Sequence, residues 1–326
     1  MFIDKMSVFS DYQFLKSQPQ TFVMLSSSLK PRYLFLLPFT VASWNKLGVE
    51  SVVVLTDDEK EFEKNGQAKE TIKLLKELNA HIIYLMPERL SHTSLSQLIR
   101  AFGAVLPIPY TSSEDETILI TSDADLVVFN ISNHIPNITD GKILHLYNSR
   151  CCHPVRVPPA RGAYKVHMYP MGTIGATVKA WKEIMGFNDT LMSLKEIEEY
   201  IFGEFGENVF HTNDDANRRL VGSFIWYADQ SLMSYKLNEW FKNTSNRNFL
   251  SEHVKAPIRI DRINWPTEEE FAKMKIEDWD DCHQPTAAFA DLEWEKFKPF
   301  LDFAFSYDPK LIERFVKYRD DFVSKK

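Results

Sequence analysis

Apolar and polar positions change in a regular order along the first 130 residues, and this order predicts strands and helices in turn. Three apolar runs that end in polar residues have the length and composition of buried strands: 20–28, 49–58 and 81–87. Segments with apolar residues on one helical face follow them: 32–48, 61–80 and 94–105. Strands that alternate with helices predict an α/β fold with a mostly parallel, Rossmann-type sheet and helices on both faces.

A fourth predicted strand leads into two aspartates in "TILITSDADLVVFN", residues 117–130. Burying an unpaired carboxylate is costly, whereas ligands of open α/β sheets bind beyond the carboxyl ends of the strands. We therefore expect Asp123 and Asp125 at that edge, where two carboxylates can hold a hard divalent cation such as Mg²⁺ or Mn²⁺. Substrate phosphates would fill the open positions of such an ion, and a pair of turn aspartates is the alternative.

Charge and missing motifs exclude several classes of ligand. The formal charge of −7 and the absence of a basic run argue against nucleic acid as a partner. No strand is followed by G-x-G-x-x-G, and no G-x-x-x-x-G-K-[ST] occurs, which disfavours a dinucleotide-binding domain and a P-loop NTPase. Any nucleotide would then have its phosphates neutralised by an ion rather than by a glycine-rich loop.

The cysteines and the apolar segments indicate the compartment. Three cysteines, Cys151, Cys152 and Cys282, lack metal-ligand spacing and predict reduced thiols in a reducing compartment. The N-terminus carries early acidic residues and no long apolar run, so we expect no signal peptide. The most apolar segment, 33–44, is too short to cross a membrane. These features predict a cytoplasmic protein without a transmembrane segment, either free or peripheral at a membrane face.

Three blocks of the sequence, within about residues 20–240, resemble the metal-dependent nucleotide-sugar glycosyltransferases of the GT-A fold. The first block, 98–129, has a helix bearing Arg100, a turn with prolines, a strand and then "DAD". The second is "YPMGTIGATVKAWKEIMGF", 169–187, and the third is "WYADQSLMSYKLNEW", 226–240.

The resemblance implies roles for residues in each block. Arg100 would approach the donor sugar or its phosphate, and Gly172 and Gly175 would let backbone come close to a bound ligand. Asp229 would lie near the acceptor, as the general base if the reaction inverts the anomeric carbon and as an orienting group if it retains it. The structural alternatives are a helix-end arginine paired with an acid, turn glycines, and an N-cap aspartate.

The nucleoside part of the donor and the third metal ligand are assigned by position. Ser26 after the first strand, together with Asp57 and Asp58 after the second, would lie near the nucleoside. Several families of the fold complete the metal shell with a C-terminal histidine. We assign His283, in "DWDDCHQP", to that place over His253, although the flanking motif of those families is missing. A solvated acidic loop is the alternative for the segment that holds His283.

We predict a catalytic domain over residues 1–245, with a nucleotide-sugar half at about 20–130 and an acceptor half at 131–245. Residues 246–326 would form a mainly helical extension, whose aromatic stripes pack on that domain or on a second copy in a homodimer. The predicted activity is a divalent-metal-dependent hexosyl or pentosyl transfer from a nucleotide-diphosphate donor, a UDP-sugar foremost. The acceptor would be a hydroxyl of a glycan, a lipid-linked glycan or a protein.

Two other functions remain open at this point. A sugar-phosphate nucleotidyltransferase uses a similar sheet and metal, but it usually carries an N-terminal glycine-rich signature, and "LSSSLKPR", 25–32, has no glycine. An inactive relative that binds a carbohydrate or a partner is the non-enzymatic alternative, because a fold does not prove activity.

Overall fold

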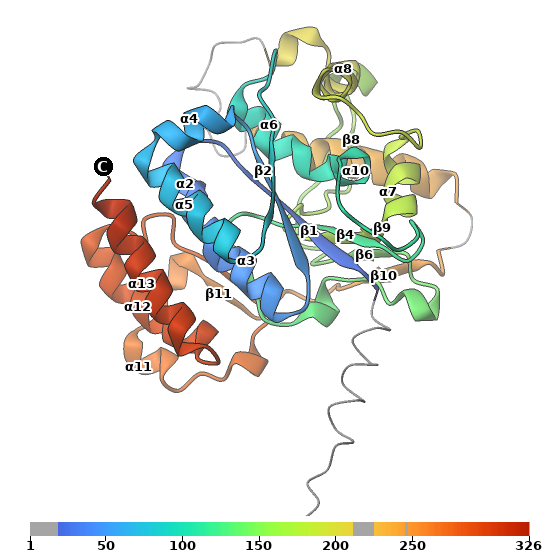
Figure 1. Cartoon of the computed structure of the whole chain (residues 1–326). Helices are drawn as coiled ribbons and strands as arrows, with labels where there is room; N and C mark the ends of the chain where they lie inside the picture. The colour runs from blue at the N-terminus through green and yellow to red at the C-terminus, as the bar shows by residue number, and fades with distance from the viewer. Residues whose placement is uncertain (1–18, 211–224, 245–246, 326) are drawn as a thin grey trace, which may run out of the picture.

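A computed structural model describes residues 19–210, 225–244 and 247–325 of the chain (Figure 1). The N-terminal segment in which we expect no signal peptide lies outside these residues. A seven-stranded sheet with the order β10-β6-β9-β4-β1-β2-β3 forms the centre of the molecule. Its strands are β1 (Thr21–Ser27), β2 (Glu50–Leu55), β3 (His81–Tyr84), β4 (Ile118–Thr121), β6 (Leu144–Leu146), β9 (Ile174–Thr177) and β10 (Leu250–Glu252).

Most neighbouring strands of this sheet are parallel, as predicted. β1 pairs in parallel with both β2 and β4, β2 with β3, and β6 with β10. β9 is the exception, because it runs antiparallel to β4 on one side and to β6 on the other. The parallel pairs bring the carboxyl ends of β1, β2 and β4 to one edge, which is where this fold class binds its ligands.

Helices cover both faces of the sheet because successive side chains of the buried strands point to opposite sides. On β1, Val23 and Leu25 pack with α3 (Leu37–Lys46) and α5 (Gly66–Glu77). Phe22 and Met24 pack in the core of the other face. The helices there are α6 (His92–Leu98), α7 (Val178–Met185), α8 (Leu194–Phe205) and α10 (Ala228–Lys242).

The predicted helices begin and end close to the expected residues, but each is divided. Segment 61–80 is split at Asn65, which ends α4 (Glu59–Lys64) and whose side chain accepts from the Ala68 amide to cap α5. Segment 32–48 is split into α2 (Pro31–Leu34) and α3, and 94–105 continues from α6 as a 3₁₀ helix, Ile99–Val105. Local hydrogen bonds that apolar periodicity does not encode cause these breaks.

The C-terminal extension is helical at its end, and it packs on the same molecule. α12 (Asp291–Phe305) and α13 (Pro309–Val323) lie against α3 and α5, beside α11 (Glu268–Phe271) (Figure 1). The Tyr318 hydroxyl is buried 2.8 Å from the Thr71 hydroxyl of α5. The aromatic stripes of both helices therefore form core contacts within one chain.

The extension also contributes strands: β11 lies in a run that the sequence predicts to be extended and β-like, whereas the sequence did not predict β12. β11 (Arg259–Asp261) and β12 (Asp281–His283) form a three-stranded sheet with β5 (Leu126–Val128), the strand after the aspartate pair. The alternative of a solvated acidic loop around His283 is wrong, since Asp281 and Cys282 are fully buried in β12. Arg259 neutralises Asp281 across the two strands, which is why an acidic stretch can be buried.

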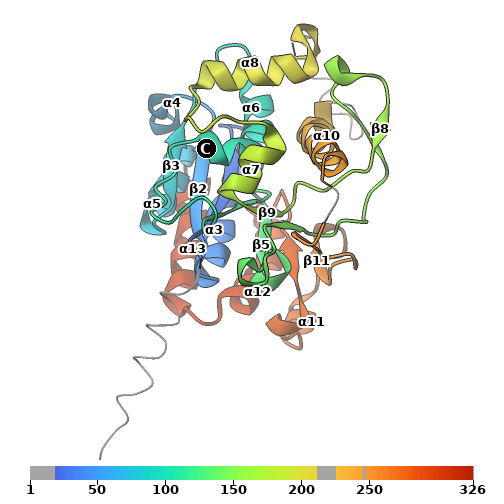
Figure 2. The same ribbon diagram turned by 90° about the vertical axis from the view of Figure 1, so that its right-hand side faces the viewer.

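A short hairpin and the cysteines complete the fold. β7 (Val155–Arg156) and β8 (Lys165–Val166) pair antiparallel, and the hairpin lies beside α10 (Figure 2). Cys151 and Cys152 are joined in a disulfide, so the prediction of reduced thiols is wrong for this pair. It is confirmed for Cys282, which is free and buried. The prediction rests on the spacing of metal-binding cysteines, and that spacing does not reveal a bond between two adjacent cysteines.

Among the described helices, none combines the length and the apolar character needed to cross a membrane.

Candidate functional site

A cavity of about 730 Å³ opens at the carboxyl ends of β1 and β4, at the edge predicted for the ligand. Its floor carries Asp123 and Asp125, and Arg100 and Asp229 line it from the side. Hydroxyl groups from the end of β1 and from α6 form much of the wall: Ser26, Ser27, Ser28, Thr93, Ser94 and Ser96. Three further cations, Lys30, Arg32 and Arg262, also line the cavity.

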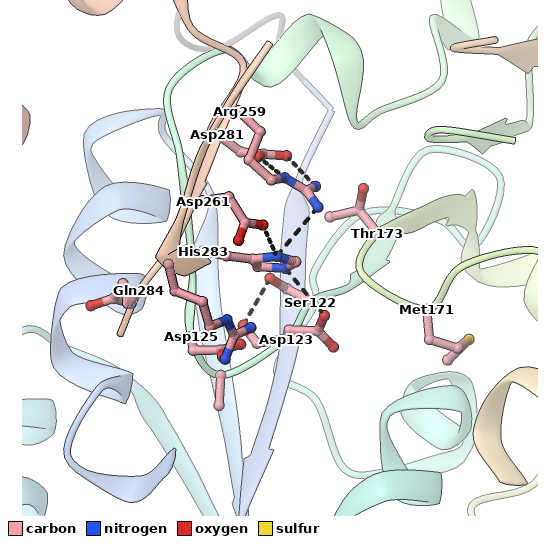
Figure 3. Close-up of polar contacts among 12 residues, drawn as sticks. Ser122, Asp123, Asp125, Met171, Thr173, Arg259, Asp261, Asp281, His283 and Gln284 are labelled. Carbon is pink, nitrogen blue, oxygen red and sulfur yellow. Dashed lines mark hydrogen bonds and ion pairs between the residues drawn. The ribbon is translucent and has the colours of Figure 1, made fainter. Parts of the chain in front are cut away.

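Asp123 and Asp125 line this cavity, and His283 lies next to them. Each offers one ligand atom, and these atoms all lie within 4.8 Å of one another. The two aspartates occupy the turn between β4 and β5, and the antiparallel register of β12 on β5 places His283 opposite Leu126. Figure 3 shows the His283 ring between Asp261 on one side and the two aspartates on the other. The structure thus brings the three predicted ligands together from positions 158 residues apart in sequence (283 − 125).

The electrostatics of the three side chains suit a cation. One Asp125 carboxylate oxygen is buried and accepts no hydrogen bond, and burial raises the pKa of this carboxyl. Burial alone would lower the pKa of His283, but the Asp123 and Asp261 carboxylates raise it to about 9. Two carboxylates and one imidazole could hold a divalent ion here, and His283 would release its proton when it binds one.

Residues behind His283 hold its ring in place. Its Nδ1 lies 3.7 Å from the Asp261 carboxylate and 3.3 Å from the Arg259 guanidinium, and Nε2 faces Asp123 at 3.8 Å. Arg259 is in turn fixed by a two-point pair with Asp281 (Figure 3). The Asp281 carboxylate also accepts from the Tyr147 hydroxyl at 2.7 Å. Such outer contacts orient a metal-ligating histidine.

Arg100 connects the aspartate turn to α10. Its guanidinium donates to Asp123 at 2.6 Å and to Asp229 at 2.7 Å, and the side chain is only 8% exposed. Burial raises the pKa of the Asp123 carboxyl, but Arg100 and His283 outweigh that effect and hold the pKa well below its usual range. Arg100 does pair with acids, as the structural alternative expected, but it is buried between two of them rather than solvated at a helix end.

Asp229 is not the N-cap of α10, which removes the structural alternative for it. The N-cap residue is Tyr227, and no side chain caps the helix. One oxygen of Asp229 accepts from the Gln97 amide at 3.2 Å, and the other pairs with Arg100. Burial raises the pKa of Asp229 in spite of Arg100. The Gln230 backbone amide also donates to Asp229 at 2.8 Å, so three donors fix a buried carboxylate at the wall of the cavity.

The two glycines of the second block have different surroundings. A side chain at Gly172 would meet the Asp123 carboxylate at 3.6 Å, so this backbone passes directly beside the aspartate turn. At Gly175 a Cβ would lie 2.4 Å from the His134 carbonyl oxygen, which leaves no space for one. Gly175 is therefore required by packing inside β9, and Gly172 is the glycine near the candidate site.

Of the three residues assigned to the nucleoside, only Ser26 lines the cavity. Ser26 lines the cavity, and its hydroxyl donates to the Ser96 carbonyl. Asp57 and Asp58 do not line it; Asp58 is exposed and caps α4 by accepting from the Lys60 amide at 2.8 Å. Asp57 faces His92 at 3.5 Å, at the start of α6.

Several residues at the site carried no signal that sequence reasoning used. Asp261 ends β11 and Arg262 follows it, in a segment whose sequence predicts only an extended run. Gln97, on α6, lies three residues before Arg100, which belongs to the 3₁₀ helix Ile99–Val105. The spacing of Gln97 and Arg100 by three residues could have indicated a shared helix face. Nothing local points to Arg262, because it reaches Asp125 only through the pairing of β11, β12 and β5.

No protein-family model matches the sequence, and no curated protein matches it either. Among solved structures, the chain is similar to the galactosyltransferase LgtC in complex with donor and acceptor sugar analogs. Identity is 11%, the match covers 87% of this chain and 95% of that one, and the TM-score is 0.40. It is also similar to the glycosyltransferase GlyE of Streptococcus pneumoniae TIGR4, with 11% identity, 95% of this chain and 64% of that one covered, and a TM-score of 0.36.

Both solved structures are glycosyltransferases, the class that the sequence resembles. Because the likeness is weak in sequence and in superposition, we base the functional proposal on the geometry of the site.

Proposed function

We propose that this chain is a glycosyltransferase that moves a sugar from a nucleotide-diphosphate donor, a UDP-sugar foremost, to a hydroxyl acceptor with the help of Mn²⁺ or Mg²⁺. The observation that carries the proposal is the convergence of Asp123, Asp125 and His283 beside a cavity that the two aspartates line together with hydroxyl groups. A nucleotidyltransferase or an inactive binding protein is not favoured by any specific observation.

The three ligands would hold the ion, and a bound ion would act as a Lewis acid toward the departing diphosphate. The serine and threonine hydroxyls of β1 and α6 can donate to and accept from ribose and sugar hydroxyls. The wall residue Gln97 fixes one oxygen of Asp229 and keeps the carboxylate oriented.

Asp229 would act on the acceptor hydroxyl. Its raised pKa suits a general base in an inverting reaction, since a base works best with a pKa near the working pH. In a retaining reaction the same carboxylate would orient the hydroxyl by accepting its hydrogen bond. Arg100 holds Asp229 and the ion-binding Asp123 in one arrangement, so it would act as a positioning residue for both partners of the reaction.

Thermal melting tests the proposal. We expect one of UDP, GDP and TDP to raise the melting temperature by several degrees only when Mn²⁺ is present, because a ligand of the folded state stabilises it by mass action. Asp125→Asn keeps the size of the side chain and removes a metal ligand, so it should abolish the shift. Asp115→Asn, at a 65% exposed position, is the matched control and should keep it.

The other outcomes are distinguishable in the same experiment. A response to a nucleoside triphosphate and a sugar phosphate, without one to a diphosphate, would indicate a nucleotidyltransferase. Indifference to all nucleotides with Mn²⁺ would contradict the proposal.

A further inference from the structure

Arg262 contacts the Asp125 carboxylate oxygen that a metal ion would need. Its guanidinium nitrogen lies 2.9 Å from the Asp125 carboxylate oxygen, although this contact lacks the geometry of a hydrogen bond. The oxygen has no other partner and is buried with the rest of Asp125. A buried carboxylate oxygen with a countercharge but no hydrogen bond is poorly satisfied, so a better ligand can take it over.

The backbone keeps Arg262 at this place but leaves its side chain room to move. Asp261 accepts from the Ile263 amide at 2.9 Å and fixes the short turn that carries Arg262 at the end of β11. The Arg262 side chain is 32% exposed and lines the same cavity as Asp123 and Asp125. It therefore has both a buried partner, Asp125, and open space in which an anion could bind.

We infer that Arg262 is an exchangeable counterion: it neutralises Asp125 while no metal is bound, and it turns to a phosphate of the donor when a divalent cation takes Asp125. This inference rests on the proposed function and names a residue that couples the two ligands of the site. A guanidinium suits both partners, because it binds carboxylate and phosphate oxygens with the same planar set of donors. The exchange would make the metal and the nucleotide bind interdependently, since each ligand removes the competitor of the other.

Charge near the cavity supports the exchange. The ion would bring two positive charges next to Asp125, and a guanidinium would then be repelled from that carboxylate. Lys30 and Arg32 line the same cavity, so an anion there would be met by cations from two separate segments of the chain. The movement needed is one of the Arg262 side chain alone, with the turn held by Asp261.

The variant Arg262→Gln gives opposite expectations for the two ligands. Titration calorimetry or Mn²⁺ electron paramagnetic resonance without nucleotide should show Mn²⁺ binding roughly tenfold tighter than in wild type, because its competitor is gone. UDP titrated at saturating Mn²⁺ should bind roughly tenfold more weakly, because the phosphate has lost its partner. Arg156→Gln removes one guanidinium from an exposed position on β7 and should change neither affinity.

The pattern of the two affinities decides between explanations. Unchanged or weaker Mn²⁺ binding in Arg262→Gln would overturn the inference and leave the proposed function intact, because wild type would still bind both ligands. Tighter Mn²⁺ binding with unchanged UDP binding would also overturn it. Arg262 would then compete with the metal for Asp125 without binding a phosphate of the donor. Absence of Mn²⁺ and UDP binding in wild type would overturn the proposed function and this inference together. Arg262→Lys, which keeps the charge, should restore part of the UDP affinity.

Discussion

At the scale of single residues, the buried ion pairs decide how the site is held. Arg100 is the only cation that contacts both Asp123 and Asp229 among the residues the structure describes, and all three side chains lie at the wall of the cavity. Without Arg100, the buried Asp229 would keep, within the described part of the chain, only the neutral donors Gln97 and the Gln230 amide, and Asp123 would keep only its contact with His283. Losing the countercharge of a buried carboxylate costs more than losing an exposed pair.

We expect Arg100→Met to lower the free energy of unfolding by about 3 kcal/mol, because it leaves the buried Asp229 carboxylate without a countercharge. The triple change Arg100→Met, Asp123→Asn, Asp229→Asn should recover most of this loss, since it removes both carboxylates that Arg100 neutralises. Urea unfolding measures both values. A triple variant no more stable than Arg100→Met would show that the cost comes from lost packing instead of charge.

At the scale of elements, pairs of strands bring together residues that the sequence keeps apart. The antiparallel pairing of β7 with β8 sets Arg156 directly opposite Lys165, whereas their neighbours Val155 and Val166 are buried toward α10. Directly opposed like charges destabilise an antiparallel pair.

Lys165→Glu should therefore raise the free energy of unfolding by about 0.5 kcal/mol, because it converts a repulsive pair into an attractive one. Chemical unfolding at low and at high salt is the measurement, and the gain should shrink as salt screens the charges. Lys255→Glu, a change of the same charge at an exposed position outside any helix or strand, is the control for effects of net charge. Equal effects of the two changes would mean that the hairpin pair contributes nothing.

The C-terminal helices form a second element-scale contact, which unites the extension with the rest of the chain. Phe315 on α13 is fully buried among aromatic residues that include Phe39 of α3, 4.5 Å away between ring centres, and Phe305 of α12. This packing predicts that the extension unfolds together with the catalytic domain.

Phe315→Ala should lower the free energy of unfolding by about 3–5 kcal/mol, the usual cost of removing a buried phenylalanine ring. Leu292→Ala, on the neighbouring helix at 83% exposure, should change it by less than about 0.5 kcal/mol. Near-ultraviolet and far-ultraviolet circular dichroism should give one common transition in urea. Separate transitions for the two signals would show that the extension unfolds on its own.

At the scale of the whole molecule, the buried histidines make stability depend on pH. His145 on β6 is held by Asn133 and by Ser251 of β10, each 2.8 Å from a ring nitrogen. Burial lowers its pKa to about 4, whereas an unfolded chain binds the proton near pH 6.5. The unfolded state therefore binds more protons over this interval, and the stabilisation present above pH 6.5 is lost as the pH falls toward 4.

We expect His145→Gln, whose amide can still donate to Asn133, to flatten this dependence. Between pH 6 and 4.5 the free energy of unfolding of wild type should fall more steeply than that of the variant, by about 1 kcal/mol per pH unit. His153→Gln, at an exposed position, should keep the slope of wild type. Parallel slopes in wild type and His145→Gln would contradict the assignment.

Local pattern alone was enough for the first half of the sheet. The apolar runs and helical stripes predicted β1 to β4, the helices between them and the position of Asp123 and Asp125 at the strand ends, because strand and helix periodicities are properties of neighbouring residues. The same pattern could not predict the break at Asn65, which depends on a capping contact of its side chain, or the break at Leu36, two residues before Pro38.

Tertiary structure decided how the site is assembled. His283 reaches the aspartates because β12 pairs with β5, Arg262 reaches Asp125 through β11, and Arg100 spans from the aspartate turn to Asp229. Each of these contacts joins residues more than 20 positions apart, for which the sequence carries no periodic signal. The chain by itself therefore determined where acids and apolar strands lie, and only the register between distant strands determined which charges face one another.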